Sequence, residues 1–233
     1  AQGPCELKLQ SSSCGAAVLL EGAQRSLAAS ASASRRICSQ QLAYVMYTSG
    51  STGKPKGVLV LLSGLGNVIF GAAQRYDSRS HHVFALTHTY HFDPFQHNLL
   101  MCIAMVGARG VLLQDNGSLI DGISVSHRAT HVADVPSVLS LARLPPTITH
   151  VVSGGEALTE AVIARVPPGA NLCNDYGPTE VTINSVCAPV AHVSSRLLSI
   201  GRPLPNVTTY NSDPDSNLID PRVGPIGVWG ELW

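Results

Sequence analysis

Short apolar segments alternate with longer segments of helical pattern, and this alternation restricts the chain to an α/β fold. The segments rich in β-forming residues are 42–47, 57–62, 82–86, 110–113 and 148–152. The segments with helical patterns are 65–76, 96–106, 136–143 and 159–166. Strands and helices in this order usually form sheets through crossover connections. We therefore expect an α/β fold of layered sheets joined by crossover helices.

Composition narrows the function classes. The 233 residues include 15 Lys and Arg against 15 Asp and Glu, so the chain has no net charge and lacks the basic patch of a nucleic-acid-binding protein. No segment reaches the roughly 18 apolar residues of a membrane helix. The 6 cysteines contain no C-x-x-C pair, which favours buried free thiols in a cytoplasmic protein over a zinc site or a disulfide framework.

The chain divides by composition into three parts. Residues 1–41 contain a Ser/Ala-rich tract at 26–34 and are expected to be a partial N-terminal segment and linker. Residues 42–202 are expected to form the α/β core. Residues 203–233 are rich in turn-forming residues, with strands expected at 207–210 and 227–232, and resemble the beginning of a truncated β-rich subdomain. Because the chain begins with Ala and ends within an apolar stretch, we expect it to be a fragment.

A glycine-rich loop follows the first expected core strand. It reads Tyr47-Thr-Ser-Gly-Ser-Thr-Gly-Lys-Pro-Lys-Gly57. Glycines allow the backbone to approach a ligand closely, and the hydroxyls and lysines supply donors and positive charge for a polyphosphate. The spacing differs from that of a P-loop, because Lys54 is followed by Pro55 rather than by Ser or Thr. On composition alone, a flexible linker is an equally available interpretation.

The string around this loop resembles the signature loop of the adenylate-forming, AMP-binding superfamily, and in particular that of amino-acid adenylation domains of nonribosomal peptide synthetases. Further segments match the family's motifs in the same order. They are Phe92-Asp93, Gly154-Gly-Glu-Ala157, Asn174-Asp-Tyr-Gly-Pro-Thr-Glu180, Gly201-Arg-Pro-Leu-Pro-Asn206 and Gly230-Glu-Leu232. The resemblance covers about residues 42–233, and 15–20 more weakly. It implies the N-terminal domain fold of an adenylate-forming ligase, with a nucleotide- and substrate-binding core at 42–202.

The resemblance implies ATP-dependent activation of an amino acid as an aminoacyl-adenylate, with Mg²⁺ as cofactor. Thr179 would bond the α-phosphate and Glu180 would hold the metal ion, and both are assigned as catalytic. The residues implied for phosphate binding are Thr48, Ser49, Gly50, Ser51, Thr52, Gly53 and Lys54. Those implied for adenine binding are Gly154, Gly155, Glu156, Asn174, Asp175, Tyr176 and Gly177. Taken alone, the Tyr-Gly-Pro-Thr-Glu segment could equally be a plain turn.

The family alignment also implies a substrate pocket, in which Asp93 would pair with the α-ammonium group of the amino acid. The implied lining is Asp93, Pro94, His97, Ala133, Val152, Gly154, Asp175, Ile183 and Asn184. The polar side chains of His97 and Asp175 favour a polar substrate, either basic or hydroxylated. Two structural alternatives stay open, since Asp93 before Pro94 is also a favourable helix start and His97 could be an ordinary buried histidine.

The chain departs from the family pattern at several positions. Leu61 and Leu62 stand where an acidic residue and a histidine are usual, and Asp175 replaces a common alanine. The small C-terminal domain with its lysine is absent, so we expect the 233 residues alone to be weakly active or inactive. The resemblance implies peptidyl carrier and condensation domains as partners, with transfer to a phosphopantetheine thiol. The alternatives are an acyl- or aryl-CoA ligase, from which Asp93 discriminates, and a noncatalytic, degenerate segment that acts as a scaffold.

Overall fold

A computed structural model gives the three-dimensional structure of the chain. It describes residues 8–11, 17–21, 38–49, 53–75, 82–104, 108–113, 128–190, 199–212 and 231–232. The Ser/Ala-rich tract at 26–34 and the centre of the glycine-rich loop, Gly50 to Thr52, lie outside these residues.

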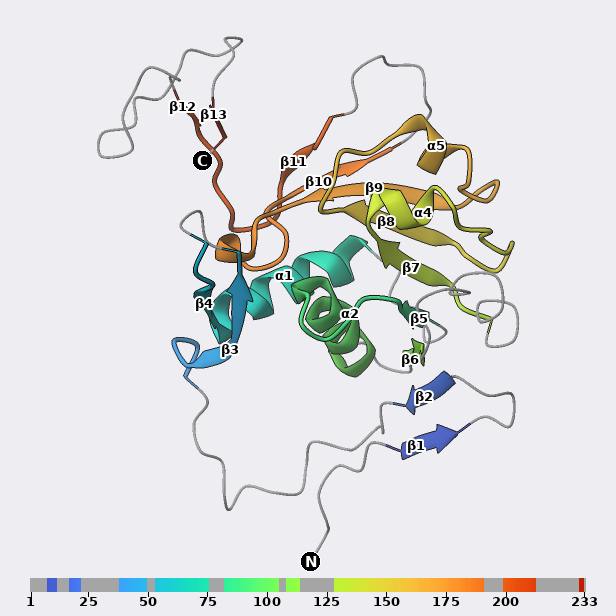
Figure 1. The fold of residues 1–233 in the computed structure, drawn as a ribbon, viewed down its shortest axis with the longest axis horizontal. Helices are drawn as coiled ribbons and strands as arrows, with labels where there is room; N and C mark the ends of the chain where they lie inside the picture. Colours follow the sequence, from blue (N-terminus) through green and yellow to red (C-terminus); the bar gives the residue numbers. More distant parts are fainter. Residues whose placement is uncertain are drawn as a thin grey trace, which may run out of the picture.

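A nine-stranded mixed sheet forms the centre of the molecule (Figure 1). Its strands lie in the order β1-β2-β6-β5-β7-β8-β9-β10-β11. The neighbours from β6 to β9 are parallel, whereas the pairs at both edges are antiparallel. The strand bounds are β1 Lys8–Ser11, β2 Ala17–Glu21, β5 Val83–Leu86, β6 Arg109–Leu113, β7 His131–Asp134, β8 His150–Gly154, β9 Asn171–Tyr176, β10 Val186–Pro189 and β11 Arg202–Pro203.

Helices cover both faces of the parallel strands. Every residue of β5 is buried, and its side chains alternate between two hydrophobic clusters. Val83 and Ala85 pack with side chains of α4 (Pro136–Leu139) and α5 (Glu160–Ile163). Phe84 and Leu86 pack with side chains of α1 (Leu62–Arg75) and α2 (Asp93–Ala104). Because alternate strand residues point to opposite faces, the two helix pairs lie on opposite sides of the sheet.

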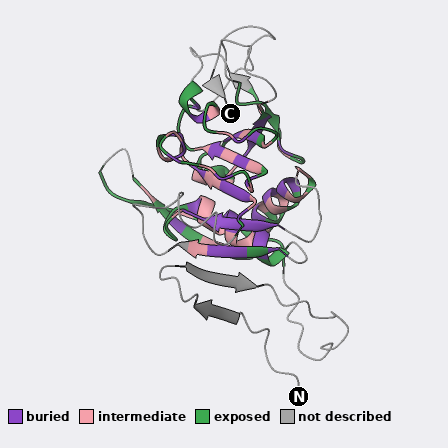
Figure 2. Ribbon diagram, turned by 90° about the vertical axis from the view of Figure 1, so that its right-hand side faces the viewer, coloured by how far each residue is buried: buried purple, intermediate pink, exposed green. Residues whose placement is uncertain are grey.

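Burial follows this layered arrangement. Figure 2 shows the buried residues concentrated along the strands of the central sheet and on the helix surfaces that face it. Apolar area removed from water in this way is worth about 25 cal/mol per Å², which makes the two-sided burial of the parallel strands the main stabilising contribution. The α/β fold with crossover helices is therefore the one expected from the sequence.

A separate hairpin carries the glycine-rich loop. Strands β3 (Leu42–Thr48) and β4 (Lys56–Leu61) pair antiparallel, and their connection spans 49–55. A third hydrophobic cluster joins Val60 of β4 and Val68 of α1 to Ile183, which follows the short 3₁₀ helix η1 (Thr179–Val181). The hairpin is thereby fixed beside η1.

Most expected elements are confirmed, with corrections at their ends and between them. The helix expected at 96–106 begins at Asp93, because Asp93 and Pro94 provide a favourable helix start. The helix expected at 136–143 is regular only over Pro136–Leu139. Residues 207–210 are not a strand, since the pairing there is between β12 (Asn211–Ser212) and β13 (Glu231–Leu232). Strands β7, β9 and β10 were not expected.

Two further sequence expectations have structural counterparts. Within the described residues, none of the helices has the length and apolar character to cross a membrane. The expectation of buried cysteines is right for Cys102 and Cys187 but wrong for Cys38, which is exposed. Cys38 lies just before the hairpin, outside all three hydrophobic clusters.

Three histidines gather at the amino-terminal edge of the parallel strands. The ring of His131 stacks on that of His150 with centroids 4.4 Å apart and meets that of His82 edge-on at 4.6 Å. Burial and the two neighbouring rings lower the pKa of His131 to about 2. His131 therefore stays neutral in the folded protein at pH values where an unfolded chain would protonate it.

We predict that this cluster makes the fold sensitive to mild acid. Because the pKa of His131 is lower in the folded than in the unfolded state, its contribution to stability is complete above pH ~6.5 and is lost as the pH falls below that value. Replacing His131 by Phe keeps a ring and removes the titrating group. Between pH 7.5 and 5.5, the loss in free energy of unfolding should be about 1.4 kcal/mol smaller in the variant.

Urea denaturation at the two pH values measures this difference. The matched control is His91→Phe, because His91 is exposed on the loop before α2. That variant should lose as much stability on acidification as the unmodified protein. An unchanged pH response in His131→Phe would show that the cluster is not the acid-sensitive element.

Candidate functional site

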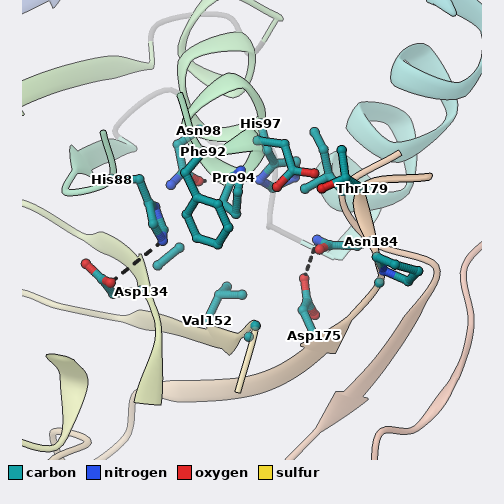
Figure 3. Close-up of a pocket in the computed structure, with 17 residues that line it drawn as sticks. His88, Phe92, Pro94, His97, Asn98, Asp134, Val152, Asp175, Thr179 and Asn184 are labelled. Carbon is teal, nitrogen blue, oxygen red and sulfur yellow. Dashed lines mark hydrogen bonds and ion pairs between the residues drawn. The ribbon is translucent and has the colours of Figure 1, made fainter. Parts of the chain in front are cut away.

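A cavity of about 220 Å³ opens at the carboxyl ends of the parallel strands (Figure 3). In sheets of this kind, that edge is where ligands usually bind. The wall contains α2, the ends of β7, β8 and β9, and the segment around η1. Its lining residues are His88, Phe92, Asp93, Pro94, His97, Asn98, Ala133, Asp134, Val152, Gly154, Gly155, Asp175, Gly177, Pro178, Thr179, Ile183 and Asn184.

The cavity brings together every residue that the sequence predicted to bind substrate. From α2 come Asp93, Pro94 and His97. From the strands come Ala133, Val152, Gly154 and Asp175, and from the loop after η1 come Ile183 and Asn184. These positions span almost a hundred residues of sequence, so their convergence on one cavity is a property of the fold. Their role in binding remains a prediction.

A second cavity, of about 590 Å³, adjoins the first and contains most of the residues predicted to bind adenine. Gly155, Asp175, Gly177 and Pro178 line both cavities. Of the predicted adenine set, Gly154 lines only the first cavity. The lining of the second is Gly155, Glu156, Ala157, Leu158, Asn174, Asp175, Tyr176, Gly177, Pro178 and Ile200.

The side chains around this second cavity differ in how firmly they are held. Asn174 is buried and its amide donates to the Ser199 carbonyl oxygen at 3.1 Å. The Glu156 carboxylate accepts hydrogen bonds from the backbone N–H and the hydroxyl of Ser137 at 3.0 and 2.9 Å. The ring of Tyr176 is half-exposed and is available to a planar ligand.

The described residues predicted to bind phosphate lie on the β3–β4 hairpin. Thr48 ends β3, and Ser49, Gly53 and Lys54 follow as exposed residues of the connection. They are not among the lining residues of either cavity. Since β4 packs against η1, the hairpin is nevertheless a neighbour of the segment that carries Thr179 and Glu180.

Thr179 and Glu180 occupy different environments within η1. Thr179 lines the first cavity, and a hydrogen bond from its side chain favours the ionised form of the neighbouring Asp93. The Glu180 side chain is exposed beside the cavity, and its charge acts on Asp93 in the opposite sense. Among the described residues, no group of three or more His, Cys, Asp or Glu side chains is arranged to hold a metal ion by itself.

Asp93 is the first residue of α2 and is only 5% exposed. Burial raises the pKa of its carboxyl group, and the hydrogen bond from Thr179 partly offsets this. Its Oδ2 atom is buried and has no hydrogen-bond partner in the part of the chain that the structure describes. Both sequence interpretations of Asp93 therefore hold geometrically: it begins the helix and lines the cavity with an open acceptor.

Asp175 belongs to a network that the sequence did not predict. Its Oδ1 atom accepts a hydrogen bond from Nη1 of Arg75 at 3.1 Å within an ion pair, and its Oδ2 atom accepts from Nδ2 of Asn184 at 2.7 Å. Arg75 is the last residue of α1, a hundred positions before Asp175. No local motif marks it, because the contact depends on how α1 packs beside β9.

His97 and Asn98 form a second polar pair on α2. Both are 4% exposed, and Nδ1 of His97 lies 3.4 Å from Oδ1 of Asn98. Burial lowers the pKa of His97 to about 4, with an opposing contribution from Asp175. Within the described residues, His97 Nε2 and Asn98 Nδ2 are buried without hydrogen-bond partners. The interpretation of His97 as a fully satisfied core histidine is therefore wrong.

Sequence reasoning also missed His88 and Asp134 in the cavity wall. Nε2 of His88 lies 3.7 Å from Oδ1 of Asp134, and burial lowers the pKa of His88 against the opposing effect of Asp134. Figure 3 shows this pair facing the cavity across from Asp175. The signal that could have found them is position, since Asp134 ends β7 and His88 follows β5 at the ligand-binding edge.

The cavity wall depends on two close backbone approaches. A Cβ atom on Gly154 would lie 2.7 Å from the Asp175 carbonyl oxygen, and one on Gly177 would lie 2.6 Å from the Asn184 Cα atom. The wall residue Ile183 has a φ of 67°, a backbone conformation that β-branched residues rarely adopt. Its neighbour Ser185 donates its backbone N–H to the Tyr176 carbonyl oxygen at 2.9 Å, which holds this turn against β9.

Comparison with known proteins provides independent evidence for this arrangement. The sequence pattern of the family described as AMP-binding enzyme matches residues 5–233. The chain belongs to this AMP-binding enzyme family. The resemblance to adenylate-forming ligases drawn from the sequence motifs is therefore confirmed.

Among curated members of the AMP-binding family, the chain is similar to one of the linear gramicidin synthase proteins of Brevibacillus parabrevis. The two are 34% identical over 211 residues, which cover 86% of this chain and 4% of the relative. The chain thus spans only a small part of the length of such relatives.

Solved structures of adenylation proteins share the fold. The Vibrio cholerae adenylation domain AlmE, in complex with glycyl-adenosine-5′-phosphate, has a TM-score of 0.72 and 26% identity over 84% of this chain and 39% of that one. A four-domain nonribosomal peptide synthetase bound to AMP and glycine has a TM-score of 0.68 and 29% identity over 82% of this chain and 14% of that one. Both confirm the predicted fold class.

We predict that Gly154→Ala destabilises the site, because its Cβ atom would meet the backbone oxygen of Asp175 rather than a movable side chain. We expect a loss of about 2 kcal/mol or more in free energy of unfolding, measured by urea denaturation. The matched control is Gly66→Ala in α1, where nothing lies within 4 Å of the added atom. That change should raise stability by up to ~1 kcal/mol, as alanine favours helices. Equal effects of the two substitutions would contradict the prediction.

Proposed function

We propose that this segment is the core of an amino-acid adenylation domain, which activates an amino acid with ATP for nonribosomal peptide synthesis. The observation that carries the proposal is the open carboxylate oxygen of Asp93 in the first cavity. A buried carboxylate needs a cation, and the α-ammonium group of an amino acid would supply it. Family membership and the adjoining second cavity support the nucleotide part of the proposal.

In this proposal the first cavity holds the amino acid and the second holds adenine. Tyr176 offers its half-exposed ring to the base, and Asn174 lies beside it in the same wall. The amino-acid carboxylate attacks the α-phosphorus of ATP and forms an acyl phosphate bond, while the bond to the β-phosphate oxygen breaks and pyrophosphate leaves. Donors must be oriented toward the developing charge, and we assign Thr179 and the hairpin residues Thr48, Ser49 and Lys54 to this role.

Mg²⁺ fits the oxygen donors present near Thr179. Glu180 has an exposed carboxylate beside the cavity, and a single carboxylate together with substrate phosphates is a usual magnesium site in such enzymes. When bound there, the ion would offset negative charge on the phosphates. Glu180 is the residue that we propose to hold it.

We further propose that the activated amino acid passes to a phosphopantetheine thiol on a peptidyl carrier domain, with a condensation domain in the same synthetase. The support is the similarity to synthetases of which this chain matches a small part, 4% in one case and 14% in another. Adenylation would then be an activity of the longer protein, rather than of this segment alone.

We predict that Asp93→Asn impairs amino-acid activation in the full-length protein. The carboxamide keeps the shape and removes the charge, so the α-ammonium group would lose its partner. A buried charge pair of this kind is worth at least ~2 kcal/mol, and we expect KM for the amino acid to rise about 30-fold or more. Amino-acid-dependent ATP–pyrophosphate exchange, with saturating ATP, measures the change.

The control is Glu160→Gln, which removes an exposed charge in α5 away from the cavities and should leave KM unchanged. Exchange that depends on simple carboxylic acids and not on amino acids would favour an acyl- or aryl-CoA ligase. A folded full-length protein with no exchange on either class of substrate would refute the proposed activity and favour a noncatalytic segment.

A further inference from the structure

The Asp175 carboxylate is fully engaged by groups of the protein itself. One oxygen accepts from Arg75 at 3.1 Å and the other from Asn184 at 2.7 Å. The Asp175 side chain is 3% exposed, whereas that of Arg75 is 21% exposed. The negative charge that Asp175 presents at the cavity wall is therefore compensated within the protein. Among the described residues, the cavity lining does not include Arg75, so the arginine acts on the cavity through Asp175.

This pairing changes what the cavity can accept. A cationic side chain that approached Asp175 would meet a carboxylate without a free oxygen, and it would bring its charge toward the partly buried guanidinium of Arg75. Both effects oppose binding in an environment of low dielectric constant. The basic substrate that Asp175 suggests from the sequence alone is thus disfavoured by a residue from another helix.

The open polar atoms of the cavity are neutral. His97 Nδ1 faces Oδ1 of Asn98, which can only accept, so the neutral ring carries its proton on Nδ1 and leaves Nε2 as an acceptor. The amide Nδ2 of Asn98 is a donor. Within the described part of the chain, both atoms are buried and have no partner. The cavity therefore offers one acceptor and one donor, side by side on α2.

We propose that the Arg75–Asp175 pair makes this cavity select a neutral amino acid whose side chain carries both a donor and an acceptor, such as a hydroxyl or a carboxamide, and exclude cationic amino acids. The inference rests on the proposed amino-acid activation. Such a side chain would satisfy His97 and Asn98 together, whereas a purely apolar one would leave two buried polar groups unpaired, which is costly. Arg75 is a positioning residue, because it acts through Asp175.

The test is ATP–pyrophosphate exchange by the full-length protein with three sets of amino acids. The sets are neutral polar (serine, threonine, asparagine, glutamine), cationic (lysine, arginine, ornithine) and apolar (leucine, phenylalanine). We expect the best neutral polar substrate to exceed every cationic one by at least tenfold in kcat/KM, a margin of the size usual for one charge mismatch. Strongest exchange with a cationic or an apolar amino acid overturns the inference, without any variant being made.

Substitution at Arg75 tests the mechanism of selection. Arg75→Met keeps length and removes charge, so Asp175 becomes available and KM for lysine should fall about tenfold or more relative to that for the neutral substrate. Arg75→Lys retains a cation and should keep the original preference. Arg143→Met removes an exposed arginine remote from the cavities and should change neither value.

Each outcome bears on the inference. Unchanged preference in a folded Arg75→Met variant overturns the role of Arg75. Should that variant not fold, Asp175→Asn provides the second measurement, because loss of the carboxylate should leave cationic amino acids excluded, and activation of lysine by it would overturn the proposal. Exchange with amino acids of the wrong class refutes this inference alone. Absence of exchange with every amino acid refutes the proposed function as well.

Discussion

The parallel hydrogen bonding of β6, β5, β7, β8 and β9 is the constraint on which the rest of the structure depends. Parallel strands need crossover connections, and these place helices on both faces, where β5 buries alternate residues in two clusters. The same geometry brings the carboxyl ends of the strands to one edge. Asp134, Gly154 and Asp175 meet there although they are far apart in the sequence.

Charge in the first cavity is distributed so that each buried ion has a different solution. Asp175 is compensated inside the protein by Arg75, and Asp134 lies near His88. Asp93 has a hydrogen bond from Thr179 and keeps one oxygen without a partner among the described residues. Uncompensated charge is expensive away from water, so Asp93 is the position at which a ligand cation gains most.

The sequence predicted the fold class and the composition of the first cavity, because both follow from local patterns. Motifs such as Asn174 to Glu180 are contiguous, and their order along the chain carries the family resemblance. Strands β7 and β9 were missed because His131–Asp134 and Asn171–Tyr176 mix polar and apolar residues and lack a β-forming pattern. Their pairing is set by neighbours in the sheet. Arg75 could not be foreseen, since its contact with Asp175 depends on helix packing.

The wall shared by the two cavities is built mostly from backbone, with Gly155 and Gly177 among its members. Residues such as His97 and Ala133 face only the first cavity, whereas Tyr176 and Asn174 face only the second. Substitutions that reshape one cavity can therefore accumulate without altering the other. A fold with this partition can diversify in what it recognises while the opposite compartment stays under separate selection. Evolutionary change would then be expected to concentrate on α2 and β7, and to spare the turn after β9.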